Sequence, residues 1–497
     1  MLFNSYIFIF LFLPLCLAGF YLLQNRHAMS AKIWLIGFSL WFYGYFNPVY
    51  LLIMVCSILG NYLIHHLMIR DSETHRKPWL ITGVSLNLLV LFYFKYFDFF
   101  LDNINTLFGS SIPLKHILLP LGISFFTFQQ ISFLVDTYHG EVDRISFPDY
   151  TLFVSFFPQL IAGPIVVHQE MLPQFERLGK DSRTREEKVS VFTKGIFVFV
   201  LGLAKKVLIA DTFGIAVDLA YSDVSALGGL ESFLTVFFYS LQLYFDFSGY
   251  CDMAKGLAGM FGMHIANNFT SPYKAINIVD FWKRWHITLS RFFTKNIYIP
   301  LGGNRKGEVR MYINYLMVFF LSGLWHGAGW NFILWGMLHG VLYVITKWYL
   351  NHRKSASCTG FGAGLCKVFL CTLTFLFVSI AWVYFRASSI EQANTLLQNI
   401  FIKPWDLPGT GFTDAFNLGE FWYALKILKL AALPYARYYI MILFTAAALI
   451  ITFFGKNVDQ LAEKFRPTVI SAAITAVLFI WCVVSLSGVS TFLYFNF

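Results

Sequence analysis

The stretch LSGLWHGAGWN, residues 321–331, places one histidine, His326, between glycines in a long apolar region. Mostly apolar residues flank it on both sides, at 311–320 and 332–338. An ionisable side chain at the centre of a bilayer costs about 2.5–3.5 kcal/mol on insertion scales, so its presence predicts a functional role. The glycines permit close approach of another backbone or a ligand and favour a helix break at the histidine. A histidine hydrogen-bonded between packed helices is the structural alternative.

The composition sets the class of protein around this stretch. Of the 497 residues, 57% are hydrophobic, 19% aromatic and only 13% charged, whereas soluble domains carry about 25% charged residues. Apolar runs long enough to cross a bilayer recur from end to end, which predicts an all-α polytopic membrane protein. Residues 1–25 are uncharged and lack a basic start and a cleavage site, so we expect a retained first span.

The apolar runs predict eleven to thirteen membrane spans. We place them at 5–24, 31–47, 48–68, 79–101, 117–135, 148–166, 192–212, 232–262, 311–327, 330–350, 366–385, 437–455 and 469–494. Residues 31–68 could form a tight hairpin around Pro48, and 148–166 could be re-entrant because it contains Pro158, Gly163 and Pro164. The sequence shows no internal repeat, which weakens the case for a transporter built from inverted repeats.

The charges favour one side of the membrane. The basic connections are 65–77, 168–195, 274–310 and 351–354, and the positive-inside rule places them in the cytoplasm. The net charge of +10 fits such loops and a polyanionic ligand, and no motif for nucleic-acid binding is present. The seven cysteines include no CxxC pair, so we expect neither a zinc site nor redox chemistry, and no metal.

The basic segment 281–295, FWKRWHITLSRFFTK, can be laid on one interfacial helix at about 100° per residue. Such a helix would bury Trp282, Trp285, His286, Leu289, Phe292 and Phe293 on one arc and turn Arg284, Thr288, Arg291 and Lys295 to the other. The alternatives are attraction to anionic lipid for the basic arc and a place in the aromatic belt for His286. Downstream, PLGGNR at 300–305 forms a turn with exposed backbone donors and a basic flank.

Two acidic residues lie inside an aromatic run. In YFDFSGYCD, residues 244–252, Asp246 and Asp252 need partners within the membrane. The cationic groups of 283–291 are candidate partners in a functional site. A structural ion pair that holds spans together is the alternative.

These motifs together resemble the membrane-bound O-acyltransferase superfamily, in its bacterial branch of alginate O-acetylation and teichoic acid D-alanyl transfer proteins. The resemblance covers nearly the whole chain and looks closer to the alginate type. It rests on 121–128, 157–164, 244–250, 281–286, 298–305 and 325–331. It implies one domain over 1–497, in which 264–310 is an interfacial segment carrying His286 and 311–350 holds the spans carrying His326.

The resemblance further implies a ring of helices around a thinned centre, with a tunnel that joins the two membrane faces. His326 would match the central histidine of the family and His286 its second polar site. An activated acyl donor would bind on the cytoplasmic side of a bacterial inner membrane. The acceptor would lie outside, where separate periplasmic proteins complete transfer to the polymer.

The residue types suit acyl transfer. A neutral imidazole can remove the proton of an attacking hydroxyl near pH 7. We favour direct transfer over a covalent intermediate, although Ser322 lies four residues before His326. The remaining predicted site residues are Trp325, Asn314, Asn331 and Asp246 in support and Lys283, Arg284, Arg291 and Arg305 for coenzyme A phosphates or an acidic carrier protein.

We therefore predict an O-acetyltransferase that acts on a cell-surface polysaccharide and uses acetyl-CoA or an acyl-carrier thioester. The acceptor stays open among alginate, cellulose, peptidoglycan and other glycans. The alternative is a transporter or flippase in which His326 and Asp246 relay protons.

Overall fold

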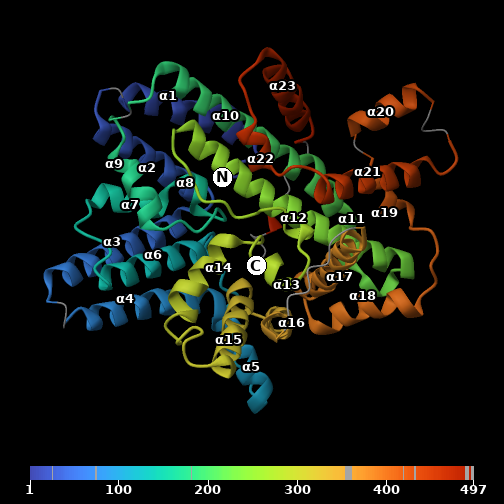
Figure 1. Ribbon diagram of the computed structural model, residues 1–497, viewed down its shortest axis with the longest axis horizontal. Helices are drawn as coiled ribbons and strands as arrows, with labels where there is room; N and C mark the ends of the chain where they lie inside the picture. Colours follow the sequence, from blue (N-terminus) through green and yellow to red (C-terminus); the bar gives the residue numbers. More distant parts are fainter. Residues whose placement is uncertain are drawn as a thin grey trace.

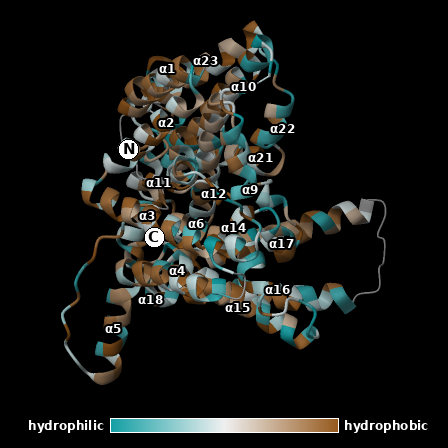
Figure 2. Cartoon of the chain, turned by 90° about the vertical axis from the view of Figure 1, so that its left-hand side faces the viewer, coloured by the Kyte–Doolittle hydropathy of each residue, from teal (hydrophilic) through white to brown (hydrophobic). Residues whose placement is uncertain are grey.

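The computed structural model describes residues 1–24, 26–72, 75–180, 182–352, 361–417, 419–429, 433–486 and 492–493, and every regular element within them is a helix (Figure 1). Brown, apolar segments run through most of the helices (Figure 2). The prediction of an all-α membrane protein is confirmed.

The helices before residue 92 lie together at one end of the molecule, and the helix at 97–108 lies away from them, at the bottom of the view (Figure 1). These N-terminal elements are η1 (Phe8–Phe12), α1 (Leu13–Gln24), α2 (Ala28–Gly44), α3 (Pro48–Arg70), α4 (Arg76–Leu91), η3 (Phe92–Tyr96) and α5 (Phe97–Phe108). The Asn47 side chain accepts from the Val49 N–H at the start of α3, and Pro48 follows at the first turn, where its missing N–H costs nothing. The predicted hairpin around Pro48 is therefore confirmed.

Two long helical segments form the axis of the fold. In one of them α10 (Arg185–Ala204) continues through the π-helix η4 (Lys205–Ala210) into α11 (Asp211–Ser222), and α12 (Gly229–Met260) packs along it. Glycines allow the backbones to touch: a Cβ on Gly202 would lie 2.6 Å from the Gly249 carbonyl oxygen, and one on Gly195 would lie 2.8 Å from that of Gly256. Small residues of this kind drive helix association where lipid removes the hydrophobic effect between helices.

By length and apolarity, four helices of the described chain suffice to cross a membrane: 48–70, 76–108, 362–386 and 436–453. Helices 8–24 and 469–484 are apolar but shorter. The count of eleven to thirteen spans and the ring around a tunnel stay predictions. The last predicted span, 469–494, is a helix only to Val484 in α23 (Val469–Val484), and beyond Leu486 only Phe492 and Leu493 fall within the described residues.

The segment predicted as a span at 148–166 is not one helix. It divides at Phe156 into α7 (Phe147–Ser155) and α8 (Phe157–Leu160), followed by irregular chain. Nine residues of α7 extend about 13 Å, less than half of a bilayer core of about 30 Å. The last six residues of α7, 150–155, are buried, and the helix packs against α2 and α3, as the re-entrant alternative requires. The neighbouring helix α6 (Ile123–Tyr138) is also almost wholly buried.

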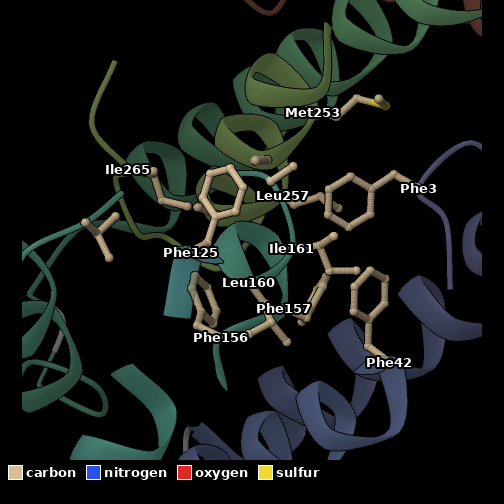
Figure 3. Close-up of a cluster of buried hydrophobic side chains, with 14 of the residues drawn as sticks. Phe3, Phe42, Phe125, Phe156, Phe157, Leu160, Ile161, Met253, Leu257 and Ile265 are labelled. Carbon is tan, nitrogen blue, oxygen red and sulfur yellow. The ribbon is translucent and has the colours of Figure 1, made fainter. Parts of the chain in front are cut away.

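An aromatic core joins these short helices to the N-terminus. Phe3, Phe42 and Phe157 turn toward one another, with ring centroids 5.4 Å apart for Phe3–Phe42 and 5.5 Å for Phe42–Phe157 (Figure 3). Ile161 from the end of the re-entrant segment and Leu257 from α12 complete the contact (Figure 3).

The rest of the chain surrounds α12. The shorter elements are α9 (His168–Glu176), η5 (Val224–Ala226), η6 (Pro272–Lys274), α13 (Ile278–Trp282), α14 (Ile287–Phe293) and η7 (Thr294–Tyr298). The helices after them are α15 (Glu308–His326), α16 (Trp330–His352), α17 (Phe361–Arg386), α18 (Ile390–Ile402), α19 (Thr410–Asp414), α20 (Gly419–Ile427), α21 (Ala436–Phe453) and α22 (Val458–Glu463). Helices α15, α16 and α17 pack in sequence, which buries one face of α15, including its end at Trp325 and His326.

Candidate active site

His326 is the last residue of α15, so the helix ends where the glycines predicted. Gly327 is extended (φ −159°, ψ 152°), and a Cβ there would lie 2.2 Å from the Phe332 ring. One turn earlier, a Cβ on Gly323 would lie 2.5 Å from the Phe332 carbonyl oxygen. The glycines therefore fold α16 back directly against the end of α15 and leave His326 at the corner.

A lysine and a tyrosine from η3 hold this corner. Lys95 Nζ donates to the carbonyl oxygens of Trp325 (2.5 Å) and His326 (3.1 Å), and the Tyr96 hydroxyl donates to that of Leu324 (2.9 Å). The last carbonyls of a helix have no partner within it and carry the negative end of the helix dipole. The half-buried Lys95 ammonium is therefore well placed to fix the position of His326.

The contacts of the His326 ring define its tautomer. Its Nδ1 lies 2.6 Å from the Ser322 carbonyl oxygen, which can only accept, so Nδ1 carries the proton. In the neutral ring, Nε2 is then the atom that can accept a proton. Only 4% of the residue is exposed, and the rings of Trp325, Trp335 and Phe385 surround it at centroid distances of 4.9, 4.9 and 5.3 Å.

The basic segment does not form the single helix predicted over 281–295. It breaks between α13 and α14 at His286, whose φ of +45° is left-handed. Asn268 causes the break because it satisfies the start of α14: its carbonyl accepts from the Ile287 N–H (3.1 Å) and its Oδ1 from the Thr288 N–H (3.1 Å). The predicted buried arc is buried as expected, but Thr288, predicted on the basic arc, is also buried.

The same asparagine orients His286. Its Oδ1 is identified by the Thr288 N–H, which can only donate, so the His286 Nδ1 at 3.2 Å must donate to it. His286 is fully buried and, like His326, has Nε2 as its basic nitrogen. The two rings lie 6.4 Å apart, and Trp325 contacts both, at 6.1 Å from His286 and 4.9 Å from His326.

A cavity of about 470 Å³ opens on the N-terminal side of His326 along α15. We call it the basic cavity, because Lys283 and Arg291 line it together with aromatic rings from α13, α15 and α16. Its wall includes Ser322, whose carbonyl holds the His326 ring. The basic cavity thus combines cationic groups with apolar surface and extends along α15 as far as Ser322, one turn before His326.

A second cavity, of about 550 Å³, opens on the C-terminal side of His326. We call it the polar cavity. Ala328 and Gly329 line it, as does Phe385, whose ring packs on His326. The polar residues in its wall are Asp218, Tyr221, Ser222, Asn331, Arg386, Ser388 and Gln392. His326 therefore lies between the two cavities in chain order, with wall residues of each within four positions.

The predicted partners of Asp246 are wrong. Its Oδ1 lies 2.6 Å from Lys206 Nζ, not next to the cations of 283–291, and its Oδ2 accepts from the Leu493 N–H at 3.1 Å. Asp252 likewise pairs with Lys205 at 2.6 Å. Both lysines lie on η4, so the acids tie α12 to η4, as the structural alternative states.

The predicted supporting asparagines are anchored elsewhere. Asn314 precedes His326 by twelve residues, about 18 Å along α15, and donates to the Gly303 carbonyl oxygen at 3.0 Å. It therefore holds the 300–305 turn and does not contact His326. Asn331 donates to the carbonyl oxygens of Tyr384 (3.2 Å) and Ala387 (2.7 Å), which fixes the start of α16 to the end of α17 beside the polar cavity.

The four predicted donor-binding cations differ in their surroundings. Lys283 is exposed at the basic cavity, and Arg305 is exposed in its turn. Arg291 also lines the basic cavity but is bound by Glu170, with Nη1–Oε1 at 2.5 Å and Nη2–Oε2 at 3.1 Å. Arg284 pairs with Asp280 at 2.8 Å.

Lys295 anchors the end of the basic segment instead of facing a ligand. Its Nζ lies 2.6 Å from Asp136 and 3.0 Å from Glu141. Burial lowers the pKa of Lys295, but the hydrogen bonds and charges of these two carboxylates outweigh burial and raise the pKa above its usual value. Lys295 therefore stays charged and ties η7 to α6.

Sequence reasoning missed Lys95 and Asn268. Lys95 had a signal, since it is a lysine in the aromatic run FYFKY of a predicted span, and a buried cation in a span predicts function. Asn268 had no comparable signal because its role depends on contact with residues 18 to 20 positions later. Among the described residues, no three or more His, Cys, Asp or Glu side chains gather as a metal site.

The apolar helices define a membrane protein. The buried His326, with a cavity before it and another after it in the chain, is a candidate acyl-transfer centre. Residues 85–387 match the model of the MBOAT, membrane-bound O-acyltransferase family. The chain belongs to this family and is a membrane acyltransferase.

Known relatives agree with this assignment. The peptidoglycan O-acetyltransferase of Helicobacter pylori is 43% identical over 80% of this chain and 80% of its own. A probable alginate O-acetylase of Pseudomonas putida is 34% identical over 100% of both chains. The teichoic acid D-alanyltransferase of Bacillus subtilis is 30% identical over 47% of this chain and 60% of its own. The predicted resemblance is therefore confirmed.

Proposed function

We propose that the protein takes an acetyl group from a cytoplasmic thioester and passes it across a bacterial inner membrane for O-acetylation of a cell-surface or exported polysaccharide. Two of the relatives are named for O-acetylation, one of peptidoglycan and one of alginate. The proposal includes a single domain over 1–497, with a tunnel between the membrane faces that passes His326.

The position of His326 between the basic cavity and the polar cavity carries this proposal. A donor that enters the basic cavity reaches Ser322, and an acceptor that enters the polar cavity reaches Gly329. Two substrates on opposite sides of one imidazole can react without either crossing the membrane. A protein that only binds one ligand has no need of this arrangement.

The chemistry follows from the tautomer of His326. Nε2 accepts the proton of the acceptor hydroxyl while the hydroxyl oxygen attacks the thioester carbonyl carbon. The C–S bond then breaks, the new ester keeps the acetyl group, and the departing sulfur takes the proton from Nε2. His286 and Trp325 complete the wall of this site, and Lys95 keeps the imidazole in place.

The basic cavity supports a donor with anionic groups and an apolar arm. Lys283 and Arg291, with the nearby Arg284 and Arg305, are suited to the phosphates of coenzyme A or the acidic surface of a carrier protein. Aromatic walls suit the thioester arm. The polar cavity suits a sugar or an intermediate carrier, and separate periplasmic proteins would complete transfer to the polymer.

The alternative of a proton-coupled transporter required Asp246 to act together with His326. Asp246 is instead held by Lys206 and the Leu493 backbone. A fixed ion pair is poorly suited to a proton relay.

The test uses a deletion strain complemented with wild-type protein or with the His326→Ala variant at equal membrane levels. Mass analysis of surface glycans should show O-acetyl groups lost in the deletion strain and restored only by wild type. The glycan that loses acetyl groups identifies the acceptor. Acetylation that persists with His326→Ala contradicts the enzyme mechanism, and a glycan exported less but acetylated normally favours the transporter.

A further inference from the structure

A third cavity, far along the chain from the proposed active site, has a strongly basic rim. It has a volume of about 410 Å³ and lies where the end of α1, the start of α10 and the end of α12 meet. Arg183, Arg185 and Lys188 line it. Arg183 is partly fixed, since its Nη2 donates to the Gly262 carbonyl oxygen at 3.2 Å. We call this the rim cavity.

An apolar groove of about 710 Å³ continues from the rim cavity between α1, α10 and α23. Leu17 on α1 and Phe192 on α10 line both spaces, so the two adjoin. The groove is walled mainly by apolar side chains, including Leu13, Ile196 and Phe479.

The lining changes character along α10 in one direction. Arg185 and Lys188 lie in its first turn, Phe192 at the junction, and Ile196 and Val200 in the groove. From Arg185 to Val200 the rise is about 22 Å, comparable to a headgroup region followed by much of one leaflet. The acids of this turn do not line either space, and Glu187 is used in the capping box with Thr184.

We propose that the rim cavity and the groove together bind one anionic phospholipid, with its phosphate headgroup at Arg183, Arg185 and Lys188 and its acyl chains along the groove. Three clustered cations at the membrane surface attract acidic lipids, and an apolar furrow on a membrane protein is filled by lipid tails. The groove favours a lipid over a soluble anion as the ligand, because a soluble anion has no apolar part that could cover the groove. The site is separate from the proposed acyl-transfer centre.

The test counts lipids bound to the full-length protein by native mass spectrometry after release from nanodiscs of phosphatidylcholine mixed with phosphatidylglycerol. Wild type should retain phosphatidylglycerol in preference to phosphatidylcholine. The triple variant R183Q/R185Q/K188Q should retain phosphatidylglycerol at a level at least about tenfold lower than wild type. The matched control K77Q/K403Q/K456Q removes the same charge from exposed positions outside the cavity and should behave as wild type.

A second variant tests the groove independently of charge. A472W fills the groove from α23 and should reduce phosphatidylglycerol retention with all three cations intact. Equal retention by the triple variant and wild type, or equal retention of the two lipids by wild type, overturns the proposal. So does full competition by millimolar inorganic phosphate or acetyl-CoA, which would indicate a soluble anion or the donor.

Discussion

The basic cavity and the polar cavity, whose wall residues lie before and after His326 in the chain, are similar in size but different in chemistry. The basic cavity, about 470 Å³, combines Lys283 and Arg291 with aromatic walls, whereas the polar cavity, about 550 Å³, has Asp218, Arg386 and a set of neutral hydrogen-bonding groups. Anionic donors suit the first and hydroxyl-rich acceptors the second. Under the proposed function, this difference would let one imidazole serve two substrates, because each cavity favours a different one.

The largest effect should come from His326, which lies between the wall residues of the two cavities in the chain. We expect His326→Ala to lower the rate of acetyl transfer in isolated membranes by about 10²- to 10⁴-fold, because a general base contributes that much. The change should appear in kcat, with the KM values for both substrates nearly unchanged. An unaltered kcat would mean that His326 is not the catalytic base for substrates bound in the two cavities.

Removal of the cap on α15 should give the next largest effect. Lys95→Met leaves the Trp325 and His326 carbonyls without their cation, and hydrogen bonds to charged groups contribute about 1.5–3 kcal/mol. We expect kcat to fall about 10- to 100-fold, with the protein still present in the membrane. Lys115→Met changes an exposed lysine in the irregular chain that follows α5 and is the matched control. Equal effects of the two variants would contradict a positioning role for Lys95.

A change confined to the basic cavity should sharpen the contrast. We expect the double variant Lys283→Ala/Arg291→Ala to raise the KM for the thioester donor by about tenfold, since each phosphate contact is charge-assisted. The kcat and the response to acceptor should change little. High salt should weaken donor binding by wild type more than by the variant. A raised KM for the acceptor instead would reverse the assignment of the cavities.

The smallest effect should come from the polar cavity. Arg386 pairs with Asp218 at 2.8 Å, and exposed ion pairs of this kind contribute about 1 kcal/mol or less. We expect Arg386→Gln to raise the KM for the acceptor by no more than about fivefold and to leave the KM for the donor unchanged. A larger change in the KM for the donor than in the KM for the acceptor would contradict the assignment of the polar cavity to the acceptor.

The sequence was most informative where the physical cause is local. The glycines around His326 predicted the end of α15, and Pro48 predicted the hairpin between α2 and α3. Pro158 and the glycine and proline after it raised the re-entrant alternative for 148–166, which the short helices support. The sequence-based prediction failed where distant groups decide, as at His286. There Asn268 accepts the hydrogen bonds of the first N–H groups of α14, and the helix predicted over 281–295 is broken.

The π-helices show the same division between local and distant causes. Lys95 lies on η3, Lys206 on η4 and Lys295 on η7, and each binds a partner on another helix. A π-turn adds one residue to the turn and rotates the side chains after it, so a periodicity of 3.6 residues assigns them to the wrong face. Such pairings depend on which helices pack together.

By itself, the sequence predicted an all-helical membrane protein, because apolar length and glycine placement are local properties, and its resemblance to a known family predicted an acyltransferase; both predictions are confirmed. The placing of His326 at the reaction centre stays a prediction. The tertiary structure alone decided that Lys95 caps α15, that Asn268 orients His286 and that Asp246 binds Lys206. It also placed two unlike cavities on the N-terminal and C-terminal sides of His326 in chain order, with wall residues of each within four positions of it. The reason is physical: a buried polar group is stabilised by whichever partner the packing brings within hydrogen-bonding distance, and that partner can be hundreds of residues away in the chain.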